Sequence, residues 1–106
     1  MPRIEVKPSA IADLDDIVEK LYSLRPRTAL KFYQSVWLTY QWLSRVPLGG
    51  SLFPQFEDTS YATMRFCKVK SFKNYIIFYM PQENGITVYH VVDGRRDYMK
   101  ELFAIA

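Results

Sequence analysis

Cationic side chains gather in two segments of the second half of this chain, where they are the most evident candidates for chemistry. They are Arg65, Lys68, Lys70 and Lys73, followed by Arg95 and Arg96. Lysine meets a phosphate as a point charge, and arginine meets it through two parallel hydrogen bonds. Such clusters are typical of a surface that binds phosphate or an anionic partner, but a solvated charged face has the same composition. The residues alone leave both interpretations open.

The remaining reactive side chains favour structural roles. Cys67 is the only cysteine, so the sequence offers neither an internal disulfide nor, from one thiol, a zinc site. The single histidine, His90, lies inside an apolar run and is expected to be structural. Asp13, Asp15 and Asp16 fall in the first half of a predicted helix, where negative charge complements the helix dipole. We therefore predict no metal site and no cofactor.

Hydrophobic periodicity predicts the elements that must position these groups. Residues 3–7 alternate as a short strand, and residues 8–22 and 26–46 have the periodicity of two helices joined tightly at Pro26. Residues 49–60 have the composition of a loop. Strands are predicted at 62–69, 74–80 and 86–92, and a short helix at 98–105. The Asn-Gly pair within residues 81–85 indicates a hairpin between the last two strands.

This order, β-α-α-β-β-β-(α), predicts an α+β domain over residues 1–106. A helical hairpin should pack on one face of a mainly antiparallel four-stranded sheet. The other face should be open, so that several of the six cations converge on it. Two helices joined this tightly should pack as an antiparallel hairpin.

The second predicted helix has two distinct faces. Ala29, Phe32, Val36, Tyr40 and Leu43 form its buried stripe. At about 100° per residue, Leu38 and Trp42 fall outside that stripe, one turn apart. An exposed apolar pair of this kind suggests a partner surface, covered by another protein or a second copy of this chain. The alternative is that the 49–60 loop folds over it.

Charge and hydropathy limit the kinds of partner and location that we expect for this protein. The formal net charge is +3 and the pI is about 9.0, which permits an anionic partner without requiring one. No apolar run approaches the length that spans a bilayer, and residues 1–6 lack the apolar stretch of a signal peptide. We therefore expect a cytoplasmic protein without a membrane partner.

The chain resembles the RelE/ParE superfamily of toxins from bacterial toxin–antitoxin pairs over nearly its whole length. The motifs that carry the resemblance are Val6-Lys7-Pro8-Ser9-Ala10, Pro47-Leu48-Gly49-Gly50, Met64-Arg65, Phe72-Lys73-Asn74-Tyr75-Ile76-Ile77-Phe78-Tyr79 and Val91-Val92-Asp93-Gly94-Arg95-Arg96-Asp97. The most specific parts are residues 74–79 and 94–97. Within them, the resemblance implies structural positions at Tyr75, Gly94 and Asp97. For Arg96, the alternative to a binding role is that it pairs with Asp97 and anchors the closing segment to the sheet; the two roles are compatible.

The resemblance implies one of two activities. RelE-like members are ribosome-dependent ribonucleases that cut messenger RNA, which would assign Arg65, Lys73 and Arg96 as catalytic residues here. They carry an Arg just after the central-strand Tyr, whereas Tyr75 is followed by Ile76. Their later Tyr falls near Leu102, an apolar residue. ParE-like members instead poison DNA gyrase by binding.

The closing Gly-x-Arg-Asp favours the ParE branch, so we expect a binding toxin rather than an enzyme. Its partners would be a cognate antitoxin and DNA gyrase, or the ribosome and mRNA in the alternative. A homodimer and a toxin–antitoxin heterotetramer are both compatible with this expectation. A degenerate member that binds its antitoxin without arresting growth is the third alternative.

Overall fold

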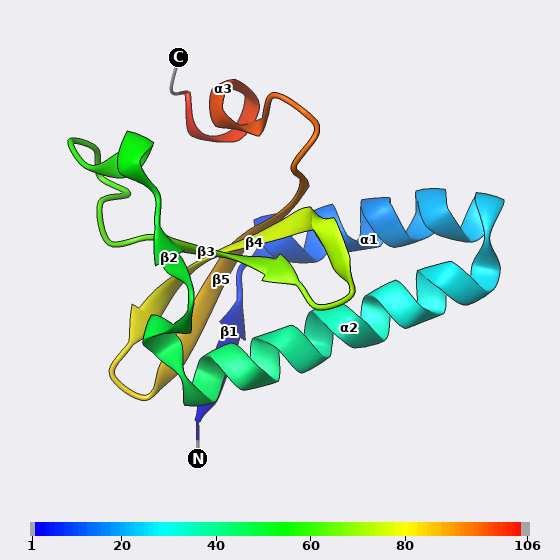
Figure 1. Ribbon diagram of the computed structural model, residues 1–106, viewed down its shortest axis with the longest axis horizontal. Helices are drawn as coiled ribbons and strands as arrows, with labels where there is room; N and C mark the ends of the chain where they lie inside the picture. Colours follow the sequence, from blue (N-terminus) through cyan, green and yellow to red (C-terminus); the bar gives the residue numbers. More distant parts are fainter. Residues whose placement is uncertain (1, 105–106) are drawn as a thin grey trace.

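The computed structural model describes residues 2–104, which form a five-stranded sheet with helices on both sides (Figure 1). The first half holds β1 (Arg3–Val6), α1 (Pro8–Leu24), α2 (Pro26–Arg45), the 3₁₀ turn η1 (Pro47–Gly49), β2 (Ser51–Leu52) and the 3₁₀ turn η2 (Pro54–Phe56). The second half holds β3 (Arg65–Val69), β4 (Phe72–Gln82), β5 (Gly85–Asp93) and α3 (Tyr98–Phe103). The predicted helix end at residue 105 lies outside the described residues. No described helix is both long and apolar enough to cross a membrane.

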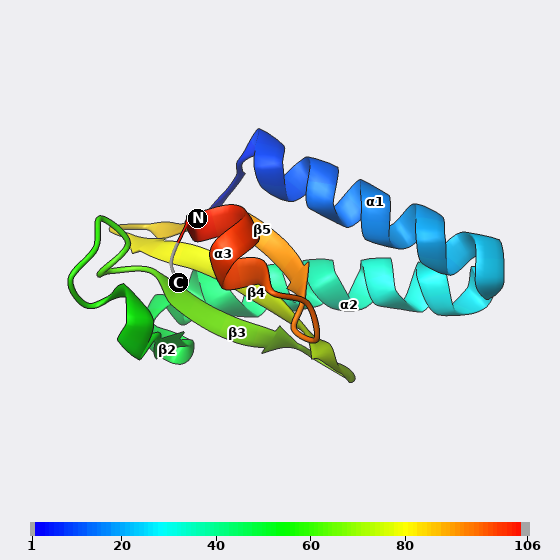
Figure 2. The same ribbon diagram turned by 90° about the horizontal axis from the view of Figure 1, so that it is seen from above.

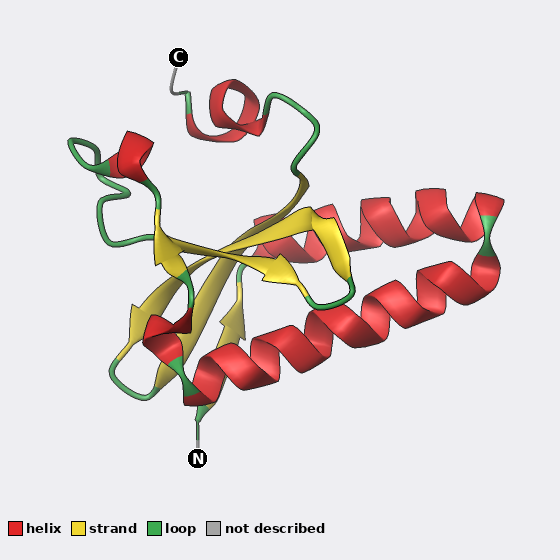
Figure 3. Cartoon of the chain, in the orientation of Figure 1, coloured by secondary structure: helices red, strands yellow, loops and turns green. Residues whose placement is uncertain are grey.

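The α1–α2 hairpin follows from two prolines. Pro8 and Pro26 each occupy the start of a helix, where the missing N–H would have no partner anyway. Pro26 also forces Arg25 out of helical geometry, and Arg25 has φ −147° and ψ 89°. Figure 3 shows the single short connection between the two antiparallel helices. The hairpin predicted from sequence is confirmed.

The sheet has the order β1-β5-β4-β3-β2. β1 is parallel to β5, with Ile4 opposite Ile86, and the other neighbouring strands are antiparallel. The mainly antiparallel α+β class is therefore confirmed, with five strands instead of four. The additional strand, β2, is only two residues long and too short to show alternation in sequence.

The β4–β5 turn is tighter than the sequence suggested. β4 continues through Gln82, so the turn contains only Glu83 and Asn84. Gly85 follows with φ +141°, and a Cβ there would lie 1.9 Å from the carbonyl oxygen of Arg3. Glycine therefore serves both the turn and the close approach of β1.

The face of the sheet towards the α1–α2 hairpin holds the first core. All five residues predicted for the buried stripe of α2 are fully buried there. They pack against residues of β4 and β5, including Ile77, Tyr79 and Val88. Phe32 also touches the ring of Tyr75 at a centroid distance of 4.7 Å.

The opposite face of the sheet is not open, contrary to the expectation from sequence. α3 lies over it, on the side away from α2 (Figures 1 and 2). Phe56 from η2 and Phe103 from α3 meet Phe78 of β4 at centroid distances of 5.9 Å and 5.1 Å. These rings, with Met64 and Val92, form a second buried cluster. Residues 49–60 thus contribute β2, the 3₁₀ turn η2 and core side chains, not only a loop.

Candidate functional site

The six predicted cations do not converge on one surface. Arg65 stands apart, because its guanidinium donates a 2.7 Å hydrogen bond to the carbonyl oxygen of Gly50. Arg65 is half-buried and pairs with Tyr79 across the β3–β4 ladder. Its observed role is to hold the segment that follows α2.

Tyr79 completes this attachment. Its hydroxyl accepts a 2.8 Å hydrogen bond from the Gly50 N–H and donates one of 2.8 Å to the carbonyl oxygen of Pro47. A Cβ at residue 50 would lie 2.5 Å from the hydroxyl, so only glycine fits. Burial raises the pKa of Tyr79, which keeps the hydroxyl protonated and able to donate. The motif Pro47-Leu48-Gly49-Gly50 thus has a structural explanation.

The other cations gather at the opposite end of the sheet. Lys68, Lys70 and Lys73 are exposed on the β3–β4 hairpin, whose turn contains Ser71 at φ +67°. The N–H of Gly94 donates a 2.6 Å hydrogen bond to the carbonyl oxygen of Asn74, next to Lys73. Arg95, which follows Gly94, is therefore close to this hairpin. We call Lys68, Lys70, Lys73 and Arg95 the cationic end.

Arg95 does not present a free charge. It donates to both carboxylate oxygens of Asp93, at 2.9 Å and 2.8 Å. These hydrogen bonds hold the pKa of Asp93 below its usual value. The Arg95 guanidinium also lies 5.9 Å from the centre of the Tyr75 ring. At Gly94 a Cβ would lie 2.9 Å from Cδ1 of Ile76 and 3.0 Å from the carbonyl oxygen of Asn74, so a larger residue would displace the Ile76 side chain.

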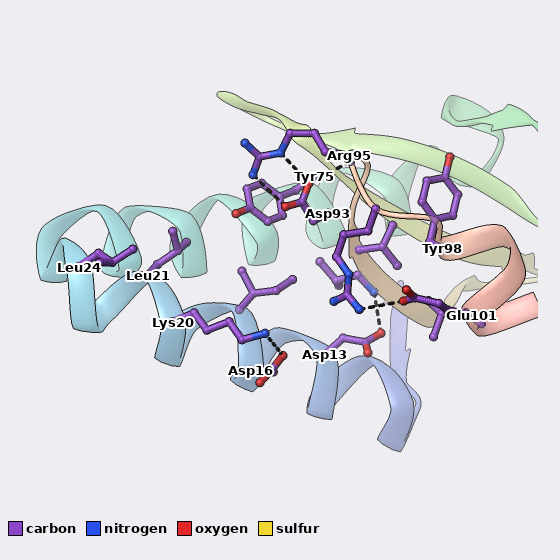
Figure 4. Close-up of a pocket in the computed structure, with 15 residues that line it drawn as sticks. Asp13, Asp16, Lys20, Leu21, Leu24, Tyr75, Asp93, Arg95, Tyr98 and Glu101 are labelled. Atoms are coloured by element: carbon purple, nitrogen blue, oxygen red, sulfur yellow. Dashed lines mark hydrogen bonds and ion pairs between the residues drawn. The ribbon is translucent and has the colours of Figure 1, made fainter.

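Beside this corner is a groove of about 470 Å³ between α1, the end of β5 and α3 (Figure 4). Its apolar lining includes Ile17, Leu21, Tyr75, Val91 and Leu102. Most of its charged groups are neutralised within the chain. The ion pairs are Asp16–Lys20 at 3.1 Å, Asp93–Arg95 at 2.8 Å and Arg96–Glu101 at 2.8 Å.

The alternative in which Arg96 pairs with Asp97 does not hold, because the carboxylate partner of Arg96 is Glu101, one turn into α3. Asp97 is exposed at the N-cap position of α3, and its side chain makes no capping hydrogen bond. Its backbone carbonyl accepts from the N–H of Glu101 at 3.2 Å. The closing segment is anchored by the apolar side chains of α3 rather than by an Arg–Asp pair.

Sequence reasoning missed one contact, between α1 and β5. One carboxylate oxygen of Asp13 lies 2.8 Å from Nδ1 of His90 and accepts a 3.1 Å hydrogen bond from the N–H of Val91. The rings of His90 and Phe103 are nearly perpendicular, with a centroid distance of 5.4 Å. Asp13 and His90 are 77 positions apart, so no local pattern indicates the pair. Among residues 2–104, no three potential metal ligands lie together.

The three residues considered for RNA cleavage are also separated. Arg65 lies opposite Tyr79, whereas Asp93, near Arg96, lies opposite Tyr75. Four residues of strand separate these positions, which is about 13 Å. Groups that stabilise one phosphate must all reach it at hydrogen-bond distance. Arg65 is therefore not arranged to act with Lys73 and Arg96 on a single scissile bond.

The exposed pair on α2 is present as expected. Leu38 and Trp42 remain about half exposed, at 55% and 48%. A Cβ at residue 49 would lie 2.6 Å from the Trp42 ring, so the indole lies directly on Gly49. The segment after α2 therefore contacts the six-membered ring of the indole, and about half of the Trp42 side chain stays accessible.

Comparisons with known proteins agree with the fold. Residues 4–98 match the family model described as the ParE toxin of the type II toxin–antitoxin system parDE. A solved structure, titled the chromosomal ParDE TA system from P. aeruginosa, is similar with a TM-score of 0.69 and 20% sequence identity. The alignment covers 88% of this chain and 96% of that one. No curated protein matches the sequence significantly.

Proposed function

Because the chain belongs to the ParE toxin family of type II toxin–antitoxin systems, we propose that it arrests growth by binding DNA gyrase in the cytoplasm. In this proposal, a cognate antitoxin holds it inactive until the antitoxin is removed. The family match over residues 4–98 is the observation that carries the proposal. It includes the cationic end and all of the sheet except Arg3.

The geometry supports binding over RNA cleavage. The Arg65 guanidinium is bonded to the backbone of Gly50, and Arg96 is paired with Glu101. Neither is poised to meet charge that develops on a phosphate, and Arg65 is about 13 Å along the strand from the Tyr75–Asp93 position beside Arg96. A ribosome-dependent ribonuclease remains the competing function for the assay to exclude.

The cationic end is the proposed target surface. Lys68, Lys70 and Lys73 are exposed, and no Asp or Glu lies between residues 59 and 82. A gyrase complex presents DNA phosphates as well as protein, and exposed lysines suit such a surface electrostatically. Arg95 contributes less, because Asp93 already occupies its guanidinium.

Purified protein tested in two assays will decide between the functions. In gyrase reactions on supercoiled plasmid, we expect the protein to trap cleaved DNA or block supercoiling. The triple variant Lys68→Glu, Lys70→Glu, Lys73→Glu should lose most of this effect, while Lys100→Glu, an exposed charge reversal on α3, should not. Transcript cleavage on translating ribosomes that is abolished by Arg96→Ala would instead establish the ribonuclease. A response in neither assay, with harmless expression, would indicate a degenerate member.

A further inference from the structure

The β3–β4 hairpin ends in residues 68–74, which we call the hairpin tip. Its exposed side chains are all polar or cationic: Lys68, Lys70, Ser71, Lys73 and Asn74. Its two apolar residues belong to the core beside α2. Val69 is 1% exposed, and the ring of Phe72 meets Phe32 of α2 at a centroid distance of 5.2 Å. The tip therefore offers a partner cations and small polar groups rather than an apolar surface.

The backbone of the hairpin tip is held on two sides. The N–H of Lys70 donates a 3.3 Å hydrogen bond to Oγ1 of Thr39 in α2. The carbonyl oxygen of Asn74 accepts a 2.6 Å hydrogen bond from the N–H of Gly94, after β5. In Figure 2 the turn of the hairpin lies at the margin of the molecule, on the opposite side of α2 from α1. A partner thus meets an ordered backbone, and only side chains lose freedom when it binds.

The surroundings of the hairpin tip are poor in negative charge. No Asp or Glu occurs in α2, or between residues 59 and 82. At this end of the sheet β5 contributes Asp93, opposite Tyr75, and both oxygens of that carboxylate accept hydrogen bonds from Arg95. Arg95 thereby neutralises a charge that would otherwise offset the lysines. The positive potential of the tip is available to an anionic partner.

The side chains of the tip favour a nucleic-acid backbone as that partner. Phosphate oxygens accept hydrogen bonds from Lys, Ser and Asn side chains, which are the types exposed here. Protein partners instead draw most of their binding energy from buried aromatic and arginine anchors, and the one aromatic ring of the tip, Phe72, is packed on Phe32. A second copy of this chain would place lysines against lysines.

The shape of the hairpin favours double-stranded DNA among nucleic acids. The major groove of B-DNA is about 12 Å wide and admits a two-stranded β-ribbon. β3 and β4 are such a ribbon, with strands about 4.8 Å apart. The major groove of duplex RNA is too narrow and deep for side chains to read. Single strands are bound by stacking on exposed aromatic rings, which the tip does not present.

We propose that the hairpin tip binds double-stranded DNA directly and independently of sequence, with its turn in the major groove and Lys68, Lys70 and Lys73 on the phosphates. The proposal rests on the proposed function, because it takes the cationic end as the target surface. It adds that the ligand of this surface is DNA itself rather than the gyrase protein. Three lysine–phosphate contacts release about three counterions, which gives the affinity a defined salt dependence.

The test is binding of the full chain to a fluorescent duplex of about 20 base pairs, followed by anisotropy in the absence of gyrase. For three phosphate contacts, log affinity should fall with log salt at a slope of about −2.7, a loss of about 40-fold between about 50 and 200 mM. Lys70→Gln should reduce the slope by about 0.9. The triple variant Lys68→Gln, Lys70→Gln, Lys73→Gln should bring the slope close to zero and weaken binding at the lower salt at least tenfold.

A matched control separates the site from the net charge. The triple variant Arg3→Gln, Lys20→Gln, Lys100→Gln also removes three exposed cations, so both triple variants change the formal net charge from +3 to zero. The control should bind DNA within about threefold of the wild-type chain, because its changes lie on β1, α1 and α3. Unfolding midpoints by circular dichroism will show that each variant folds. If the hairpin triple variant does not fold, the slope of Lys70→Gln decides.

Equal loss of binding in the two triple variants, or an unchanged slope in the hairpin variants, would overturn the proposal. So would equal or tighter binding to the single strand or to duplex RNA of the same sequence, or a preference of more than about tenfold between two unrelated DNA duplexes. The gyrase assay is read separately. Inhibition of gyrase without DNA binding would overturn the direct DNA contact and leave the proposed function in place. DNA binding without an effect on gyrase would support the DNA contact and overturn the proposed function.

Discussion

Replacement of Tyr79 by phenylalanine is a direct test of how the segment after α2 is held. The change removes one oxygen atom from a fully buried side chain and keeps its ring. That oxygen accepts from the Gly50 N–H and donates to the Pro47 carbonyl, both at 2.8 Å. No cavity larger than a hydroxyl group is created, so the effect reports the hydrogen bonds.

The magnitude follows from what is left unpaired. A buried N–H that loses its acceptor costs about 1–3 kcal/mol, and loss of the second hydrogen bond adds about 1 kcal/mol. We expect Tyr79→Phe to lower the free energy of unfolding by about 2–3 kcal/mol. For a domain of this size, that corresponds to a fall in Tm of about 10 °C.

Urea denaturation followed by circular dichroism measures this loss, and tryptophan fluorescence reports the local change. Trp42 rests on Gly49, so loosening of the Pro47–Gly50 segment should increase solvent access to the indole and shift its emission to longer wavelength. Tyr22→Phe is the control, because Tyr22 is 56% exposed. An unchanged midpoint and unchanged emission would refute the assignment of Tyr79 as the residue that holds this segment.

Three further substitutions test other contacts. Tyr40→Phe should preserve stability or raise it by up to about 1 kcal/mol, because the buried Tyr40 hydroxyl has no hydrogen-bond partner. Burial also raises the pKa of Tyr40 above 10.0, so at high pH the folded chain keeps a proton that the unfolded chain releases. Denaturation measured over a pH series should therefore show the stability of the wild-type chain falling as the pH rises past 10.0. The fall should be smaller in Tyr40→Phe. Gly85→Ala should cost more than about 3 kcal/mol in urea denaturation, since its methyl group would meet the backbone of Arg3 and φ is positive; full stability would contradict the close approach. Asp13→Ala should cost about 2 kcal/mol and accelerate hydrogen exchange at the N–H of Val91, whereas unchanged exchange would argue against the contact.

Periodic elements were predictable because their signals are local. The apolar spacing of α2 identified Ala29, Phe32, Val36, Tyr40 and Leu43, and all five are fully buried. The same helical geometry separated Leu38 and Trp42 from that face, and they are exposed. The position of a residue along a helix determines whether its side chain points towards the core. The helical repeat alone is therefore sufficient to predict which residues of α2 are buried.

The second cluster was not predictable in the same way. Phe56 lies in a 3₁₀ turn after Pro54, without a repeat that would indicate burial, and it is nevertheless fully buried against Phe78. The expectation of an open cationic face failed because segments 49–60 and 98–103 cover that face with aromatic rings. Such coverage depends on where non-periodic segments turn back, which local sequence does not specify.

The same distinction between local and tertiary features applies to the site residues. The exposure of Lys68, Lys70 and Lys73 follows from their place at a hairpin end, which the strand pattern indicates. The partners of Arg65 and Arg96 depend on tertiary approach, to the carbonyl of Gly50 in one case and to Glu101 in the other. Sequence therefore identified charged groups more reliably than it identified their partners.

The parallel pairing of β1 with β5 affects when a nascent chain can acquire its fold. Ile4 leaves the ribosome 82 residues before its partner Ile86. In a chain that has been synthesised only to residue 80, β5 is missing and β1 has no strand with which to pair. In the same chain, Asp13 lacks its partner His90. Pairings of such long sequence separation form late, after a large loss of chain entropy. The complete sheet, and any activity that depends on it, is therefore confined to chains whose translation has passed β5.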